Sequence, residues 1–216
     1  MSADYLLADW PAPGNIIAGT TYRDTQLASL GLQDYPCRLR QVHGTDVVVA
    51  REYDEAPSAD AAVSDSADQP CVIQTADCLP VLFCARDGSR FGAAHAGWRG
   101  LAAGVLENAV GALGIPPQDL LVWFGPAISQ PSFEVGDDVR EAFVNRDRRA
   151  MSCFIPNDRG RWQADLYGLA RQRLNTLDIG QIYGGGECTF SNQEHYVSYR
   201  REPGCGRLYT FVARRN

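Results

Sequence analysis

Three residues of this sequence are candidate ligands for a transition metal, and two of them stand at the edge of an apolar run. Cys78 comes just before the run 80–84, and His95 ends the run 91–95. His43 lies upstream in Gln-Val-His-Gly-Thr-Asp. One thiolate and two imidazoles suit Zn²⁺ or copper, whereas Mg²⁺ and Ca²⁺ prefer oxygen ligands. The sequence therefore offers His43, Cys78 and His95 as the ligands of one metal ion.

Three protein ligands leave one position of a tetrahedral ion open for water or substrate, as in catalytic zinc sites. Such an ion lowers the pKa of bound water to about 7. We expect Asp77 and Asp46, the carboxylates nearest in sequence, to orient the imidazoles. A second interpretation needs no metal: Cys78 is a nucleophile and His95 is its base. Both interpretations need a thiolate beside an imidazole, so the sequence leaves both open.

The spacing of these residues is weak evidence, because ligands on separate strands match no compact zinc motif such as paired C-x-x-C. Composition alone favours histidines that form ordinary hydrogen bonds and a cysteine that is simply buried. The chain has only three histidines, however, and two stand in glycine-flanked turns beside predicted buried strands. Such turns often carry active-site groups. We expect the third, His195, to be solvated or locally hydrogen-bonded.

Arginines near these motifs are candidates for anion binding. Arg99 stands in Gly-Trp-Arg-Gly after the second apolar run, and Arg200 and Arg201 come shortly before Arg207. A guanidinium group binds phosphate through two parallel hydrogen bonds. We predict Arg99, Arg200 and Arg201 as substrate- or phosphate-binding residues; the alternative is surface arginines paired with carboxylates. No P-loop and no Rossmann fingerprint is present.

Composition limits the class of protein. The 216 residues carry a net charge of −6, and 45% of them are hydrophobic. Neither a basic run nor an apolar run of membrane-spanning length occurs, so nucleic-acid and membrane partners are not indicated. The first ten residues lack the basic and apolar parts of a signal peptide, and seven scattered cysteines argue against disulfides. We expect a cytoplasmic protein with a small-molecule substrate, acting as a monomer or homodimer.

Hydrophobic patterning predicts strands mixed with helices along the whole chain. We expect strands at residues 16–18, 47–50, 61–63, 71–75, 81–85, 90–95, 120–124, 181–183, 196–199 and 208–213. We expect helices at residues 101–113, from an Asp137 cap to about residue 145, and after an Asp165 cap, with a loop at 146–160. The mixed order and the absence of a linker predict one α/β domain of residues 1–216, with helices packed on a mixed sheet.

Several motifs follow one another from about residue 38 to residue 210. The most specific are Thr-Ala-Asp-Cys at 75–78 and His-Ala-Gly-Trp-Arg-Gly at 95–100; others include Gln-Val-His-Gly, Pro-Ser-Ala-Asp-Ala and Ser-Tyr-Arg-Arg. With these motifs the sequence resembles the YfiH-like family, also called the multicopper polyphenol oxidase or laccase-domain family. The resemblance implies a single-domain α/β/α sandwich with a mixed sheet. It also implies a catalytic metal site at His43, Cys78 and His95.

The activity that the resemblance implies is zinc-dependent phosphorolysis of purine nucleosides, including methylthioadenosine, together with deamination of adenosine. Two alternatives stay open: a copper-dependent polyphenol oxidase, which is a laccase-like oxidoreductase, and a Cys–His hydrolase that edits peptidoglycan precursors. A four-copper laccase centre needs about ten His and Cys ligands. With three histidines, this chain supports at most one copper ion in the same three-ligand site.

Two departures from the family pattern affect this interpretation. The family's long Gly-rich loop before Gln-Val-His is missing, because residues 20–24 lead almost directly to residues 30–33. Near the end, Cys205-Gly-Arg207 replaces Thr-Gly-Arg, and His195 has no family counterpart. If the missing loop walls the substrate pocket in the family, we expect a more open site or an altered specificity here.

Overall fold

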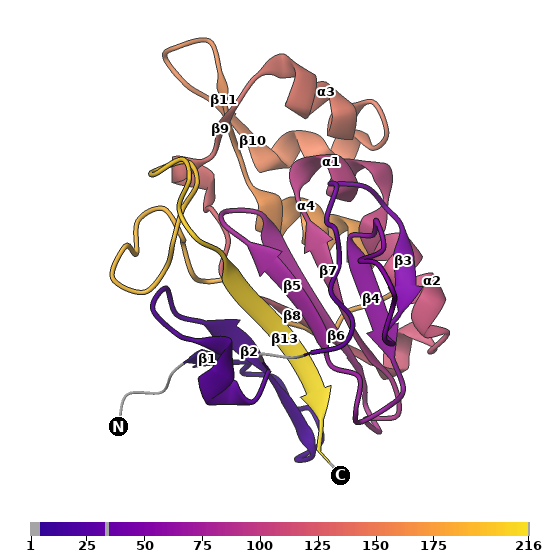
Figure 1. Cartoon of the computed structure of the whole chain (residues 1–216). Helices are drawn as coiled ribbons and strands as arrows, with labels where there is room; N and C mark the ends of the chain where they lie inside the picture. Colours follow the sequence, from indigo (N-terminus) through magenta and orange to yellow (C-terminus); the bar gives the residue numbers. More distant parts are fainter. Residues whose placement is uncertain (1–4, 33–34, 216) are drawn as a thin grey trace.

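A computed structural model describes residues 5–32 and 35–215 (Figure 1). Its central layer is a six-stranded sheet made of β3 (Val47–Val49), β4 (Ala61–Ser64), β6 (Leu79–Ala85), β7 (Phe91–Ala96), β8 (Leu120–Phe124) and β12 (Ile182–Gly184). The strand order is β12-β8-β6-β7-β4-β3. The outer pairs β12–β8 and β3–β4 are parallel, and the inner pairs are antiparallel. The expected mixed sheet is therefore present.

Helices cover one face of this sheet. They are α1 (Trp98–Ala103), α2 (Val105–Leu113) and α4 (Leu166–Asn175). Leu106 and Leu169 pack with Val81 and Phe83 of the sheet in one buried apolar cluster. The helix expected at residues 101–113 is divided in two, because Gly104 adopts a left-handed conformation with φ 113° that side-chain-bearing residues avoid.

A second sheet covers the opposite face. It contains β1 (Tyr5–Leu7), β2 (Ile16–Thr21), β5 (Cys71–Thr75) and β13 (Leu208–Arg214), all antiparallel in the order β1-β2-β13-β5. Ile73 and Val212 of this sheet pack against Leu82, Phe91 and Trp123 of the central sheet. In Figure 1 the long β13 lies beside β5 in front of the central sheet.

The α/β class, the mixed sheet and a single compact arrangement are confirmed. The layers run helices, six-stranded sheet, four-stranded sheet, so strands take the place of the second helical layer. The residue pattern gives the reason: Val72 and Ile73 are consecutive and both buried, as are Phe211 and Val212. Strands that are apolar on both faces need a covering layer on each side.

A small three-stranded sheet and a further helix lie beyond this core. The strands are β9 (Glu134–Val135), β10 (Phe154–Pro156) and β11 (Trp162–Ala164), in the order β10-β11-β9, next to α3 (Asp137–Val144). Short 3₁₀ turns are η1 (Leu27–Leu30), η2 (Pro117–Asp119), η3 (Gln130–Ser132) and η4 (Arg148–Cys153). The region expected as a loop at 146–160 therefore contains η4 and β10.

Two further local expectations were wrong. Residues 196–199 form no strand, although Tyr196, Val197 and Ser198 are buried; their burial comes from the loop packing on its surroundings. The residue that caps α3 is Gly136, and Asp137 is the first helical residue. Within residues 5–32 and 35–215, no helix has the length and apolar character that crossing a bilayer requires. Residues 1–4, 33–34 and 216 of the expected domain lie outside the described part.

The cap of α4 provides a test of this local folding. The Asp165 side chain accepts a hydrogen bond of 3.0 Å from the backbone N–H of Gly168. Replacing Asp165 by alanine should lower the free energy of unfolding by about 1 kcal/mol, because a helix donor loses its partner. Urea denaturation measures this change. The control Asp158→Ala, at an exposed loop position, should change stability far less; equal losses would contradict the capping role.

Candidate metal centre

The β6–β7 hairpin brings Cys78 and His95 to the same end of the central sheet. Leu79 pairs with Ala96 and Pro80 with His95, so Cys78 stands just before β6 where the partner strand is ending. Asp77, the residue before the cysteine, has a positive φ of 88°. The local turn therefore directs the chain into β6 with the thiol at the end of this central strand.

His43 reaches the same place from the loop before β3. Its backbone is left-handed, with φ 60°, a conformation that costs free energy for a residue with a side chain. The turn is held by one carboxylate. Asp60 Oδ1 accepts from the His43 N–H at 2.9 Å, and Oδ2 accepts from the N–H groups of Val42 at 3.1 Å and Gly44 at 2.7 Å.

The same carboxylate orients His95. Asp60 Oδ1 lies 2.7 Å from His95 Nδ1, and a carboxylate only accepts, so Nδ1 carries a proton; in the neutral imidazole, which is the form that binds a metal, the lone pair is then on Nε2. The strand register explains the contact: Ala61 pairs with Ala94, and the His95 N–H donates to the Asp60 carbonyl at 2.7 Å. Asp60 is completely buried and His95 is 3% exposed.

Asp60 takes the role that the sequence assigned to Asp77 and Asp46. The Asp77 carboxylate instead accepts from the Thr189 hydroxyl at 2.6 Å and from the Arg200 N–H at 2.7 Å. Asp46 contributes its backbone carbonyl, which accepts from the Asp60 N–H. Sequence proximity misled the assignment, although one signal was available: Asp60 is an acidic residue directly before an apolar strand.

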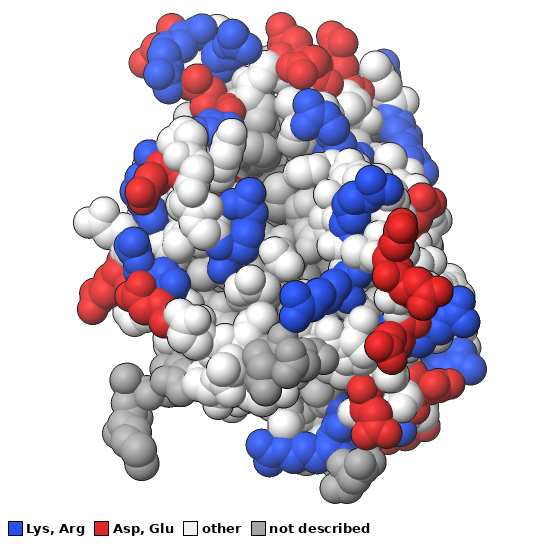
Figure 2. All heavy atoms as spheres, in the orientation of Figure 1, with Lys and Arg blue, Asp and Glu red and all other residues white. Residues whose placement is uncertain are grey.

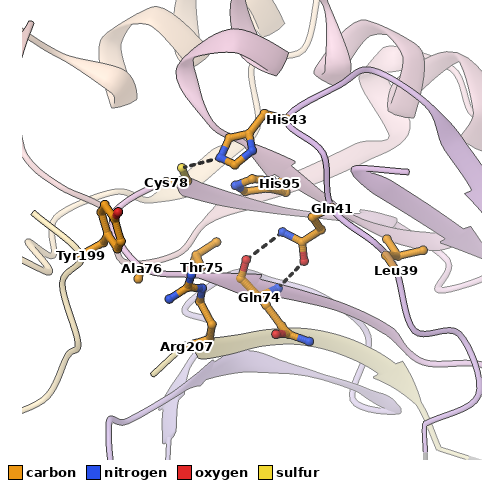
Figure 3. Close-up of a pocket in the computed structure, with 10 residues that line it drawn as sticks. All are labelled: Leu39, Gln41, His43, Gln74, Thr75, Ala76, Cys78, His95, Tyr199 and Arg207. Carbon is orange, nitrogen blue, oxygen red and sulfur yellow. Dashed lines mark hydrogen bonds between the residues drawn. The ribbon is translucent and has the colours of Figure 1, made fainter. Parts of the chain in front are cut away.

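Cys78, His43 and His95 each direct one donor atom to a common point, with these atoms within 4.8 Å of one another. Cys78 Sγ and His43 Nε2 are 4.0 Å apart, and Figure 3 shows the three side chains facing one another. Gly97 lies beneath them: a Cβ atom there would come within 2.9 Å of His43 Cδ2 and 3.1 Å of Cys78 Sγ. The glycine keeps this space clear, and the donor set fits zinc or copper.

The same contacts alter the ionisation of the thiol and of one imidazole. Burial opposes the charged form of Cys78, but hydrogen bonds and charge from His43 and His95 outweigh it and lower the pKa of the thiol to about 6. Burial would likewise lower the pKa of His95, but Asp60 and the Cys78 thiolate raise it to about 9. A thiolate beside a charged imidazole is therefore the favoured state of the metal-free protein near neutral pH.

A pocket of about 560 Å³ opens beside the three ligands, within the usual size range for small-molecule sites. Besides the ligands, its wall includes Leu39, Gln41, Gln74, Tyr199 and Arg207. The Gln41 carboxamide pairs with both the N–H and the carbonyl of Gln74 at 2.8 Å. This contact fastens the loop that carries His43 to the edge of β5.

The three arginines predicted for substrate or phosphate binding are not among the pocket-lining residues of the described chain. The guanidinium of Arg99 lies 4.4 Å from the ring centroid of Trp98. Arg200 donates to the Glu134 carbonyl at 3.1 Å. Arg201 donates to three main-chain carbonyls, including that of Tyr196 at 2.7 Å. Their binding roles remain predictions, and Arg207 is the arginine that the structure places at the pocket.

His195 behaves as expected. Its Nδ1 is 3.1 Å from the side-chain oxygen of Asn192, and its ring lies 4.9 Å from that of Tyr22. Among the described residues its side chain contacts Asn192, Tyr22 and Tyr196, so it serves local packing. The sequence analysis did not single out three residues of this candidate site, Asp60, Gly97 and Tyr199, since their contacts run across the fold.

Comparison with known proteins identifies the family. The family model described as multi-copper polyphenol oxidoreductase laccase matches residues 20–215. A purine nucleoside phosphorylase of Pseudomonas aeruginosa is 44% identical over 96% of this chain and 97% of its own length. The purine nucleoside phosphorylase YfiH of Escherichia coli is 46% identical over 88% of this chain and 78% of its own length. This chain therefore belongs to the laccase-like YfiH family.

A solved structure shows the same fold. The crystal structure of a Neisseria meningitidis protein superposes with a TM-score of 0.93 at 38% identity, covering 99% of this chain and 100% of that one. The alignment with the Pseudomonas relative spans 236 positions, more than the 216 residues present here. That relative therefore has residues without a counterpart in this chain, as expected if the Gly-rich loop is missing.

The role of Asp60 can be tested by metal binding. Replacing Asp60 by asparagine puts an NH₂ group where only an acceptor fits, so both imidazoles lose their orientation. We expect zinc affinity to fall by about 10- to 100-fold, measured by titration against a competing chelator. The matched control Asp46→Asn should bind zinc like the wild type. A loss in Asp46→Asn without one in Asp60→Asn would contradict the assignment.

The lowered pKa of Cys78 predicts an unusual pH dependence of its reactivity. In the metal-free protein, alkylation of Cys78 by iodoacetamide should persist down to about pH 6 and be lost below it, as the thiolate takes up a proton. Cys205, whose pKa is raised mainly by burial, serves as the internal control and should react only at higher pH. Mass spectrometry of both peptides follows the two rates; coincident profiles would contradict the prediction.

Proposed function

We propose that this protein is a metal-dependent purine nucleoside phosphorylase, with zinc as the metal held by His43, Cys78 and His95. The observation that carries the proposal is the convergence of these three donor atoms beside a 560 Å³ pocket. The names of the relatives from Pseudomonas aeruginosa and Escherichia coli support the choice of reaction. A nucleoside and a phosphate are the small-molecule substrates that the proposal requires.

The chain's own residues determine where the reaction takes place. Asp60 keeps the Nδ1 proton of His95 and fixes the His43 turn, so the ligand atoms stay directed at the pocket. Tyr199, which is 54% exposed, lines one end of the pocket and offers an aromatic face for a purine base, and Leu39 lines the opposite end (Figure 3). A zinc ion held by the three ligands would supply a Lewis acid at this position.

Phosphorolysis transfers the ribosyl group from the base to phosphate. An oxygen of hydrogenphosphate forms a bond to C1′ of the ribose as the C1′–N9 bond breaks. The electron pair of the broken bond stays on the base, which takes up the proton that hydrogenphosphate brought. The products are ribose 1-phosphate and the free purine, so no oxidant or reductant is required.

We extend the proposal to methylthioadenosine, which has the same C1′–N9 bond, and to deamination of adenosine. Deamination uses water instead of phosphate: a water oxygen replaces the C6 amino group, and ammonia leaves. Because of their positions in the sequence, we keep three arginines as candidates for contacts with the anionic substrate: Arg99, Arg200 and Arg201. A cytoplasmic location and a monomer or homodimer are part of the same proposal.

One observation favours a second candidate, a thiol nucleophile without a metal. The lowered pKa of Cys78 and the raised pKa of His95 describe the ion pair that Cys–His hydrolases use. Metal content separates the two candidates. A nucleophile would keep its activity after chelation, whereas a metal-dependent phosphorylase would lose it and regain it with zinc. Oxidation of a phenolic dye under added copper tests the polyphenol oxidase alternative.

Replacing Cys78 by alanine should abolish both metal binding and purine turnover, because it removes the thiolate ligand. The assay incubates zinc-loaded protein with adenosine, inosine and methylthioadenosine, with and without phosphate, and follows free bases by chromatography. Cys188→Ser is the matched control; its oxygen can still accept the Ser129 N–H bond that the sulfur accepts at 3.4 Å. Full activity in Cys78→Ala would overturn the metal-site account.

A further inference from the structure

The proposed reaction needs a group that holds a phosphate dianion. The three metal ligands lie on one side of the pocket, so a permanent cation on the opposite wall must come from another residue. The chain has a net charge of −6 and contains no lysine, so all 20 of its basic residues are arginines. Arginine is therefore the permanently charged side chain that this sequence can offer to an anion in the pocket. On the face shown in Figure 2, basic side chains flank a central hollow, while acidic ones lie towards the rim.

Arg207 is the arginine that lines this pocket. Figure 3 shows it below Thr75 and Ala76, with His43 and Cys78 at the opposite side. Its Nη1 donates to the carbonyls of Cys205 at 3.0 Å and Gly206 at 3.1 Å. These bonds orient the group within its own turn, and the other guanidinium nitrogens have no hydrogen-bond partner among residues 5–32 and 35–215. Among the described residues, no carboxylate forms an ion pair with it.

Strand pairing fixes Arg207 relative to the metal ligands. Leu208, the first residue of β13, pairs with Thr75, the last residue of β5. The chain then continues from Thr75 through Ala76 to Cys78, while Arg207 stands just outside β13 at the same end. One strand register thus places a ligand and a cation on two sides of one pocket. Arg207 itself is exposed, and the paired residue that follows it sets its position along the chain.

The three arginines singled out in the sequence differ from Arg207 in this respect. Arg201 has three main-chain acceptors, and Arg200 and Arg99 contact Glu134 and Trp98. We propose that Arg207 binds the phosphate substrate, holding it across the pocket from His43, Cys78 and His95. The identity of the anion rests on the proposed function; the position of the anion site rests on the pocket itself.

The test compares Arg207→Gln with Arg207→Lys and with the control Arg148→Gln, an exposed arginine of η4 outside the pocket. Two quantities are measured on zinc-loaded protein: inorganic phosphate binding by calorimetry, and the KM values for phosphate and inosine. For Arg207→Gln we expect phosphate affinity to fall, and the phosphate KM to rise, by roughly 10- to 100-fold, the range for a lost hydrogen bond to a charged group. The inosine KM and the zinc content should stay unchanged, and the lysine variant should fall between.

The outcomes separate this inference from the proposed function. If the wild type binds phosphate and Arg207→Gln does not, the anion site is supported even when no nucleoside is cleaved. In that case only the proposed function fails. Phosphorolysis with an unchanged phosphate KM in Arg207→Gln overturns the inference and leaves the function standing. Equal losses in Arg207→Gln and Arg148→Gln, a loss in Arg99→Gln or Arg200→Gln instead, or no phosphate binding by the wild type also overturn it.

Discussion

The buried carboxylate of Asp60 is the constraint on which the rest of the site depends. A charge that is completely removed from water is costly unless hydrogen bonds satisfy it. Asp60 receives four: three backbone N–H groups of the turn at residues 42–44 and the Nδ1 proton of His95. These bonds stabilise the left-handed backbone of His43 and set the direction of His95. One acidic side chain thereby positions two ligands that are 52 residues apart in the sequence.

The second sheet gives the ligands a pocket. The six-stranded sheet alone would present Cys78 and His95 at the open end of its central strands, next to Gly97. The end of β5 and the start of β13 form the opposite wall with Thr75 and Arg207, and the Gln41 carboxamide closes the gap between β5 and the His43 loop. Packing one sheet on the other is therefore what turns a set of ligands into a site that can hold a substrate.

Local patterns were enough to predict the parts of the fold that neighbouring residues determine. The β6–β7 hairpin, the Asp165 cap and the buried strands at 71–75 and 120–124 all follow from runs, turns and caps within a short window. The three candidate metal ligands also came from local signals and the family motifs. The structure brings them together as expected, which their spacing could not establish.

Contacts between distant segments account for the remaining errors. Asp60 acts on residues 42–44 and on His95, and nothing in the neighbouring sequence marks those partners; Asp77 and Asp46 were chosen because they are adjacent to ligands. Tyr196, Val197 and Ser198 are buried in a loop, and a short run of buried residues in a loop has the same sequence pattern as a strand. The arginines were judged by their neighbours in sequence, whereas the register of β13 against β5 determines which of them faces the pocket.

Anomalous X-ray diffraction from crystals of the metal-loaded protein tests the central claim most directly. Data collected on both sides of the zinc and copper absorption edges identify the element and its position in one experiment. The account requires a single strong peak, at the zinc edge, bonded to Cys78 Sγ and to one nitrogen each of His43 and His95. A fully loaded crystal with no peak among these three side chains, or with the metal held by other residues, would contradict it.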